Sequence, residues 1–311
     1  MDTEKKYYLN GQLNGITFYQ LNDDELNTSQ KFVEMTRHLQ EINQLYSIFK
    51  FNIECLQKKY ILMGDGDTYI GEIPAGSEED FIRINSHIIN IISSGKTLVD
   101  SIESYIKCCS TYEKENLEFL EIYHNTYDTS FSYRLLTQLR NYSQHGHLPV
   151  SKSKNNYYFD LNQIFYKPHF KHNTKLKHQM QEIIEEIETK YKDSPTLSLT
   201  RTIAEYIAKL LFIYKTFWIM IEKELNDTFT CMKKVIEANP ENLYNELFIY
   251  NIELNTAHAI PIHDNPNDMI NQFKTEASNI CSEYTEAYEK LINNSISIRY
   301  NETEQRIEVK I

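Results

Sequence analysis

Glycine and proline are scarce in this sequence, which has 8 glycines and 7 prolines among 311 residues. Because these two residues interrupt regular structure, their scarcity favours long helices over many short strands. Cysteines are also few. They are odd in number and include no C-x-x-C pair, so they indicate neither a disulfide framework nor a zinc knuckle: Cys55, Cys108, Cys109, Cys231 and Cys281.

The sequence shows the pattern of neither a membrane-spanning segment nor a secretory signal. The most apolar run, residues 203–221, is interrupted by Glu205, Lys209 and Lys215, which is typical of a buried helix or a subunit interface. The first residues, MDTEKKYYLNGQ, contain no apolar stretch of the kind that a secretory signal needs. We therefore expect a cytoplasmic protein in a reducing setting, with no membrane partner.

Positive charge is scarce over the whole chain but concentrated in one segment. The net charge is −12, which taken alone argues against a nucleic-acid partner. Residues 129–181, here called the basic window, hold eight basic residues against the single acid Asp160, which gives +7 and leaves −19 on the other residues. A run of charge is often only a solvated face, but this reversal of sign predicts a site for an anionic ligand. The basic residues are Arg134, Arg140, Lys152, Lys154, Lys167, Lys171, Lys175 and Lys177.

Hydrophobic residues make up 41% of the chain, enough for a core, and their periodicity predicts a mainly α fold with small β additions near both termini. We expect a mixed α/β region over residues 1–76, a helical domain over residues 77–240, and a helix plus β-hairpin over residues 241–311.

The first region is predicted to contain a hairpin in YYLNGQLNGITFY, a helix from Thr28 and two short strands around GDGD. The helical domain is predicted to begin behind a Ser77 cap. Its further helices cover about 113–127, 130–145, 173–192 and 199–238, with a short strand in 155–161. After Pro240 we expect a short helix, a polar loop HAIPIHDNPND, a helix at about 270–292 and a hairpin in SISIRYNETEQRIEVKI.

Chemistry-bearing residues gather in the segment LRNYSQHGHLPV, residues 139–150, at the centre of the basic window. Asn141 and His145, four residues apart, share one face of a helix, and Arg140 lies about 140° around the axis from His145. Gly146 is suited to the position after the helix, and Pro149 prevents the helix from continuing. The helix dipole also favours cations at a helix C-terminus, so a purely structural role for Arg140 and His145 is the alternative to a functional one.

The arginine, the polar residue after it and the histidine resemble the R-x4–6-H motif of the HEPN superfamily (higher eukaryotes and prokaryotes nucleotide-binding). The wider phrase from Tyr127 to Gly146 is similar to uncharacterised bacterial members of that superfamily. The resemblance covers about residues 80–238 and implies a HEPN-like helical bundle. It also implies a metal-independent endoribonuclease without a cofactor, acting at a site shared by two subunits of a homodimer.

The residues suit that chemistry. Attack of a ribose 2′-hydroxyl on the neighbouring phosphate needs a base, an acid and a cation, and imidazole and guanidinium supply these roles. We therefore expect His145 and Arg140 as catalytic residues, with Asn141 orienting His145 or holding the phosphate. A two-fold dimer would supply two histidines, and the helix around Trp218 is either its interface or core. His147 lies outside the motif and is set aside.

Six lysines are candidate RNA contacts, with an ordinary loop as the alternative: Lys152, Lys154, Lys167, Lys171, Lys175 and Lys177. By analogy with the family, we expect the chain to be a toxin or antiviral effector that acts on RNA. A further expected partner is an inhibitor or activator protein. Two alternatives from other classes remain: a non-catalytic HEPN-like module that binds nucleotide or RNA, and a helical interaction protein whose basic window docks an acidic partner.

Overall fold

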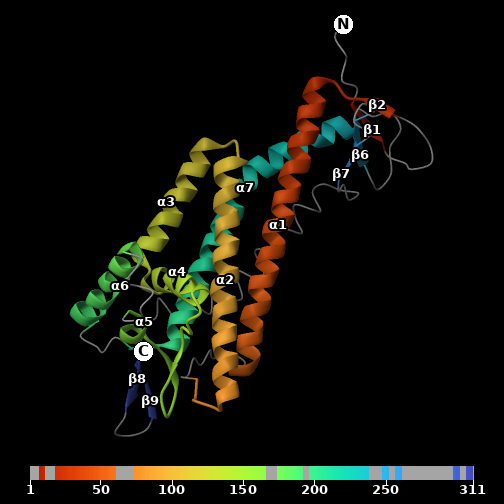
Figure 1. Cartoon of the computed structure of the whole chain (residues 1–311). Helices are drawn as coiled ribbons and strands as arrows, with labels where there is room; N and C mark the ends of the chain where they lie inside the picture. The colour runs from red at the N-terminus through yellow and green to blue at the C-terminus, as the bar shows by residue number, and fades with distance from the viewer. Residues whose placement is uncertain are drawn as a thin grey trace. The chain divides into compact units, whose positions relative to one another are not determined.

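The computed structural model describes residues 7–10, 18–60, 73–165, 174–191, 196–237, 247–251, 256–260, 297–301 and 306–310. These residues are mainly helical with small antiparallel sheets, which confirms the predicted fold class (Figure 1). The chain divides into two compact units, each assembled from three stretches. Unit 1 comprises residues 1–43, 103–119 and 216–279, and unit 2 comprises residues 44–102, 120–215 and 280–311. The boundaries expected at residues 76 and 240 stay a prediction.

The first two long helices begin at reciprocal caps. Helix α1 (Asp23–Tyr60) starts five residues before the expected Thr28, because the Asn22 and Glu25 side chains each accept a hydrogen bond of 2.9 Å from the other's backbone N–H. Helix α2 (Glu78–Cys108) starts at the predicted Ser77 cap. The Ser77 Oγ accepts a hydrogen bond of 3.2 Å from the Asp80 N–H, and the Asp80 carboxylate accepts one of 3.1 Å from the Ser77 N–H.

The other helices lie close to their expected positions. Helix α4 begins one residue after its Ser130 cap, and the helix expected at about 173–192 is α6, which ends in a π-helical segment over Ile187–Tyr191. The remaining bounds are α3 (Glu113–Thr129), α4 (Phe131–Gln144), α5 (Leu161–Phe165), α6 (Thr174–Glu186) and α7 (Leu199–Glu237).

Unit 1 holds a four-stranded antiparallel sheet in the order β2-β1-β6-β7. The expected N-terminal hairpin is confirmed as β1 (Tyr7–Asn10) paired with β2 (Phe18–Gln20). Strand β1 also pairs with β6 (Leu247–Asn251), which in turn pairs with β7 (Thr256–Ile260).

These last two strands correct the prediction for the segment after Pro240. Its described part forms strand where a short helix and a polar loop were expected, because the partner that completes the sheet lies at the other end of the chain.

Unit 2 holds two small sheets. Strand β4 (Tyr157–Asp160) confirms the predicted strand and pairs antiparallel with β3 (Ser151–Lys152) and β5 (Thr196–Ser198). The C-terminal hairpin is confirmed as β8 (Ser297–Asn301) and β9 (Arg306–Lys310). The GDGD turn and the helix predicted at about 270–292 lie outside the described residues.

The core of unit 2 is built where α1, α2 and α7 approach closely. Gly95 of α2 is buried, and a Cβ at this position would lie 2.5 Å from Leu210 Cδ1 and 3.0 Å from Phe49 Cε2. Tyr46 and Tyr214 stack with ring centroids 4.1 Å apart. The glycine therefore permits a contact between three helices that a larger residue would hold apart.

In unit 1, aromatic rings form the corresponding core. Phe217 of α7 packs edge-on against Tyr105 and Phe119, and Phe32 of α1 packs against Phe229. Trp218, 6% exposed, also contacts Phe217, so this side chain belongs to the core of its own chain. Among the described residues no helix combines the length and apolar character needed to cross a membrane.

Candidate functional site

Helix α4, which carries the motif, is fixed at its N-terminal end. The Ser130 Oγ accepts from the Tyr133 N–H and donates to Glu205 of α7 at 3.0 Å, and the Ser132 hydroxyl donates to the other Glu205 oxygen at 2.7 Å. Arg134 donates to Glu186 of α6 at 2.6 Å and to the Asp128 carbonyl at 3.1 Å. These contacts set the position of α4 against α6 and α7, and with it the position of the motif.

The C-terminal end of α4 confirms the predicted stop. His145 is the C-cap with φ −89° and ψ 17°, and Gly146 follows with φ +82°, a conformation that favours glycine. The His145 N–H donates to Tyr142 O and the Gly146 N–H to Ser143 O, at 3.2 and 3.0 Å. The chain leaves the helix three residues before Pro149.

The Nε atom of Arg140 is buried without a partner. The side chain as a whole is half-buried, and no residue in the described part of the chain forms a hydrogen bond with this Nε. Burial raises the pKa of the Tyr206 hydroxyl, and the Arg140 guanidinium opposes this rise, so the two groups lie close together. Tyr206 stacks on Tyr133, one of the residues that α4 buries.

Asn141 and His145 lie on a different side of α4. Asn141 is half-buried and His145 is exposed at the helix end, and their spacing of four residues gives them one face. Arg140 instead follows Tyr133 by seven residues, two helical turns, so it faces α7 with that tyrosine. A single chain thus offers the histidine to solvent and keeps part of the arginine inside.

The six lysines predicted as RNA contacts have different surroundings. Lys152, Lys154 and Lys177 are exposed, and the Lys152 ammonium donates to the carbonyls of Gly76 and Ser77 just before α2. Lys167 and Lys171 lie outside the described residues, and Lys175 is described only by its position in α6.

A groove of about 460 Å³ lies directly beside the motif, lined by ten residues of which the sequence had singled out only Lys152 as functional. No local pattern marks it, because its walls come from separate stretches: the start of α2, the end of α4, β3 and α5. The lining residues are Phe81, Tyr142, Gly146, His147, Leu148, Val150, Ser151, Lys152, Gln163 and Ile164.

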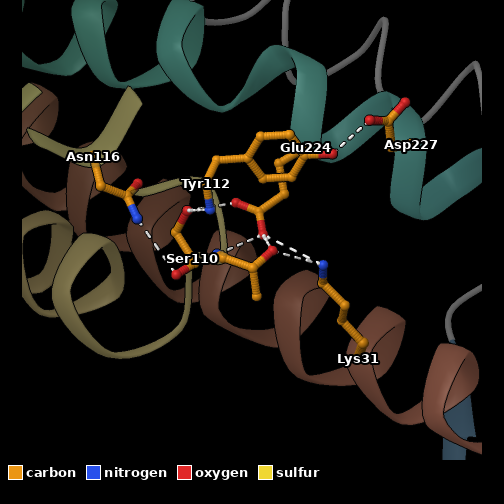
Figure 2. A network of polar contacts seen from close by, with 7 residues as sticks. Lys31, Ser110, Tyr112, Asn116, Glu224 and Asp227 are labelled. Atoms are coloured by element: carbon orange, nitrogen blue, oxygen red, sulfur yellow. Dashed lines mark hydrogen bonds and ion pairs between the residues drawn. The ribbon is translucent and has the colours of Figure 1, made fainter. Parts of the chain in front are cut away.

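Unit 1 contains a second polar cluster, centred on Glu224 of α7 (Figure 2). Glu224 is 2% exposed, yet its carboxylate accepts from the Ser110 hydroxyl at 2.6 Å and from the Thr111 N–H and hydroxyl at 3.0 and 2.9 Å. Lys31 of α1 lies 3.5 Å from it. The charge is fully compensated, which is typical of a structural tie between α7, α1 and the turn between α2 and α3.

The same turn carries Tyr112, whose hydroxyl donates to Asp227 (Figure 2). This hydrogen bond, with a smaller effect of burial, raises the pKa of Tyr112 to about 12. Buried charge is thus paired in this cluster, in contrast to Arg140.

No family model matches this chain, and no curated protein or solved structure is similar enough to match it.

Proposed function

We propose that this protein is an endoribonuclease of HEPN type, which cleaves RNA by transesterification at a composite site of a homodimer. The observation that carries the proposal is the buried Nε atom of Arg140, which has no hydrogen-bond partner among the described residues. A half-buried guanidinium whose buried Nε has no partner in the described residues is costly unless it serves a ligand, and its chemistry matches a phosphate.

The motif supplies the remaining groups for this reaction. His145 is exposed at the end of α4, where an imidazole can take the proton of a 2′-hydroxyl or give one to the leaving 5′-oxygen. The half-buried Asn141 shares its face and orients His145 or holds the phosphate. Three described lysines of the basic window are exposed, which supports attraction of a polyanion.

A dimer supplies what one motif lacks. The reaction asks for both an acid and a base, and each chain has one R-x4-H motif, so a two-fold axis near the ends of two α4 helices would bring two histidines to one phosphate. Because Arg140 lies on a different side of α4 from His145, the exposed part of its half-buried side chain would approach the phosphate from another direction and neutralise charge that develops in the transition state. Within the family resemblance, such an enzyme is a cytoplasmic toxin or antiviral effector, restrained or triggered by a partner.

A cleavage assay tests the proposal. Wild type is expected to cut mixed RNA in the presence of a chelator, with His145→Ala and Arg140→Ala each reducing the rate by about 10²–10⁴-fold. His124→Ala, which removes an exposed histidine of α3, serves as the matched control and should leave the rate unchanged. RNA binding without cleavage by a dimeric wild type would instead support the non-catalytic alternative.

The composite site has its own test. A heterodimer of wild type with His145→Ala, purified through two different tags, retains one complete motif. If acid and base come from different subunits, its rate falls to less than about a tenth of the wild-type rate. A rate near half that of wild type would mean that each chain cuts independently.

A further inference from the structure

The groove beside the motif has an apolar floor and an open mouth. Val150 and Ile164 are buried beneath it, and the Phe81 ring, on the first turn of α2, packs against Tyr157 with centroids 6.2 Å apart. Leu148 is 51% exposed on the groove's wall. A volume of about 460 Å³ falls in the range of sites that bind small organic molecules.

The rim of the groove is polar and carries no negative charge. Among the described residues that line it, none is acidic, whereas Lys152 and His147 are basic. The Gln163 Oε1 accepts a hydrogen bond of 3.4 Å from the Ser151 hydroxyl, which leaves the amide NH₂ able to donate to a ligand. Lys152 uses part of its donor capacity on two backbone carbonyls, and an ammonium has three donors.

The groove lies beside the proposed catalytic histidine, which is next to one of its lining residues in the chain but does not itself line it. Tyr142 and Gly146 both line it, and His145 lies directly before Gly146 and one turn after Tyr142. A ligand seated in the groove therefore lies against the last turn of α4, the turn that also carries His145.

We propose that this groove is a base-binding subsite for one unpaired nucleotide of a single-stranded RNA, a proposal that rests on the ribonuclease function proposed above. The base lies between Phe81 and Leu148, and the Gln163 amide hydrogen-bonds to its edge. Lys152 contacts the phosphate on one side of that nucleotide, and the next phosphate extends toward His145.

The features of the groove fit a nucleotide better than a peptide or a neutral apolar ligand. A planar ring with hydrogen-bonding edges needs apolar faces and an amide, and the attached phosphate needs a cation. Apolar faces, an amide and a cation are all present on its walls, and all the lining residues except Phe81 belong to the basic window, whose charge is +7 against −19 elsewhere.

Binding of labelled single-stranded RNA tests the subsite. Homopolymers of about 12 nucleotides and the four nucleoside monophosphates are titrated by fluorescence anisotropy, with all variants made in the His145→Ala background so that strands stay intact. Leu148→Asp should weaken RNA binding about tenfold, because it removes an apolar contact surface and places a carboxylate in the groove. Ile82→Asp, an equally exposed neighbour of Phe81 outside the groove, is the matched control and should change binding by less than about twofold.

Each outcome separates the two proposals. Equal effects of the two aspartate variants, or no RNA binding by the parent, overturn the subsite even if wild type cleaves RNA. The predicted difference without cleavage by wild type keeps the subsite and overturns the ribonuclease. Mononucleotides that bind more tightly than the strands would identify a free nucleotide as the ligand and overturn the assignment to RNA. Gln163→Ala should shift the preference among homopolymers, and unchanged preference would contradict the role given to its amide.

Discussion

Two arginines on helix α4 differ in what surrounds them. Arg134 is held by the Glu186 carboxylate and the Asp128 carbonyl, whereas Arg140, less than two turns further along, has a buried Nε without a partner in the described residues. A sequence shows both as basic residues of one helix and cannot distinguish them. The difference depends on which side chains of α6 and α7 face each position.

This difference predicts opposite effects on stability. Arg140→Met should leave the free energy of unfolding unchanged or raise it by about 1 kcal/mol, because it removes a partly desolvated charge whose buried Nε has no partner in the described residues. Arg134→Met should lower it by about 1–2 kcal/mol, since it removes the closer of the two ion pairs of Glu186 and leaves only the contact with Lys190 at 3.7 Å. Urea denaturation followed by circular dichroism measures both. Equal losses in the two variants would show that the Arg140 side chain is structural.

At the scale of helices and strands, the sequence was sufficient to predict those elements whose ends are determined by residues within or next to them. The Ser77 cap, the stop at Gly146 and the long apolar stripes all lie within a few residues of what they determine, and the corresponding helices were predicted. Strands β6 and β7 were missed, since β6 is completed by β1 at the opposite end of the chain. The groove was missed for the same reason: its walls combine the segment 142–152 with α5 and with Phe81 of α2, which is about sixty residues away in the chain.

The hydrogen-bond cluster around Glu224, which links α7 to α1 and to the turn between α2 and α3, gives a prediction at this scale. Glu224→Ala leaves the Thr111 N–H and two hydroxyls without their acceptor in unit 1, so the free energy of unfolding should fall by about 3 kcal/mol. Asn226→Ala, which removes an exposed amide of the same helix two residues further along, should cost less than about 0.5 kcal/mol. Thermal or urea unfolding compares the two, and equal small effects would show that the cluster does not hold the helices together.

Across the whole molecule, buried tyrosines predict sensitivity to alkali. Burial raises the pKa of Tyr142 to about 12, and it also raises the pKa values of Tyr105, Tyr133 and Tyr206. Because the folded state keeps these phenols neutral while the unfolded chain ionises them from about pH 10, their contribution is complete below pH 10 and is lost as the pH rises through 12.

The free energy of unfolding should therefore fall by up to about 1.4 kcal/mol per pH unit for each such phenol in this window. Urea unfolding at a series of pH values measures the slope. Tyr142→Phe, which removes one of these phenols, should make the slope shallower than that of wild type. An identical slope in wild type and variant would mean that Tyr142 ionises as readily in the folded chain as in the unfolded one.

The central claim, cleavage by attack of the ribose 2′-hydroxyl with His145 and Arg140, is tested most directly by the chemistry of the product ends. A defined single-stranded RNA is incubated with wild type, His145→Ala and Arg140→Ala, and the 5′ fragments are analysed by mass spectrometry. The account predicts 2′,3′-cyclic phosphate ends with wild type and their loss in both variants. Fragments that carry 3′-hydroxyl ends, or cyclic phosphate ends formed equally by the His145→Ala variant, would contradict it.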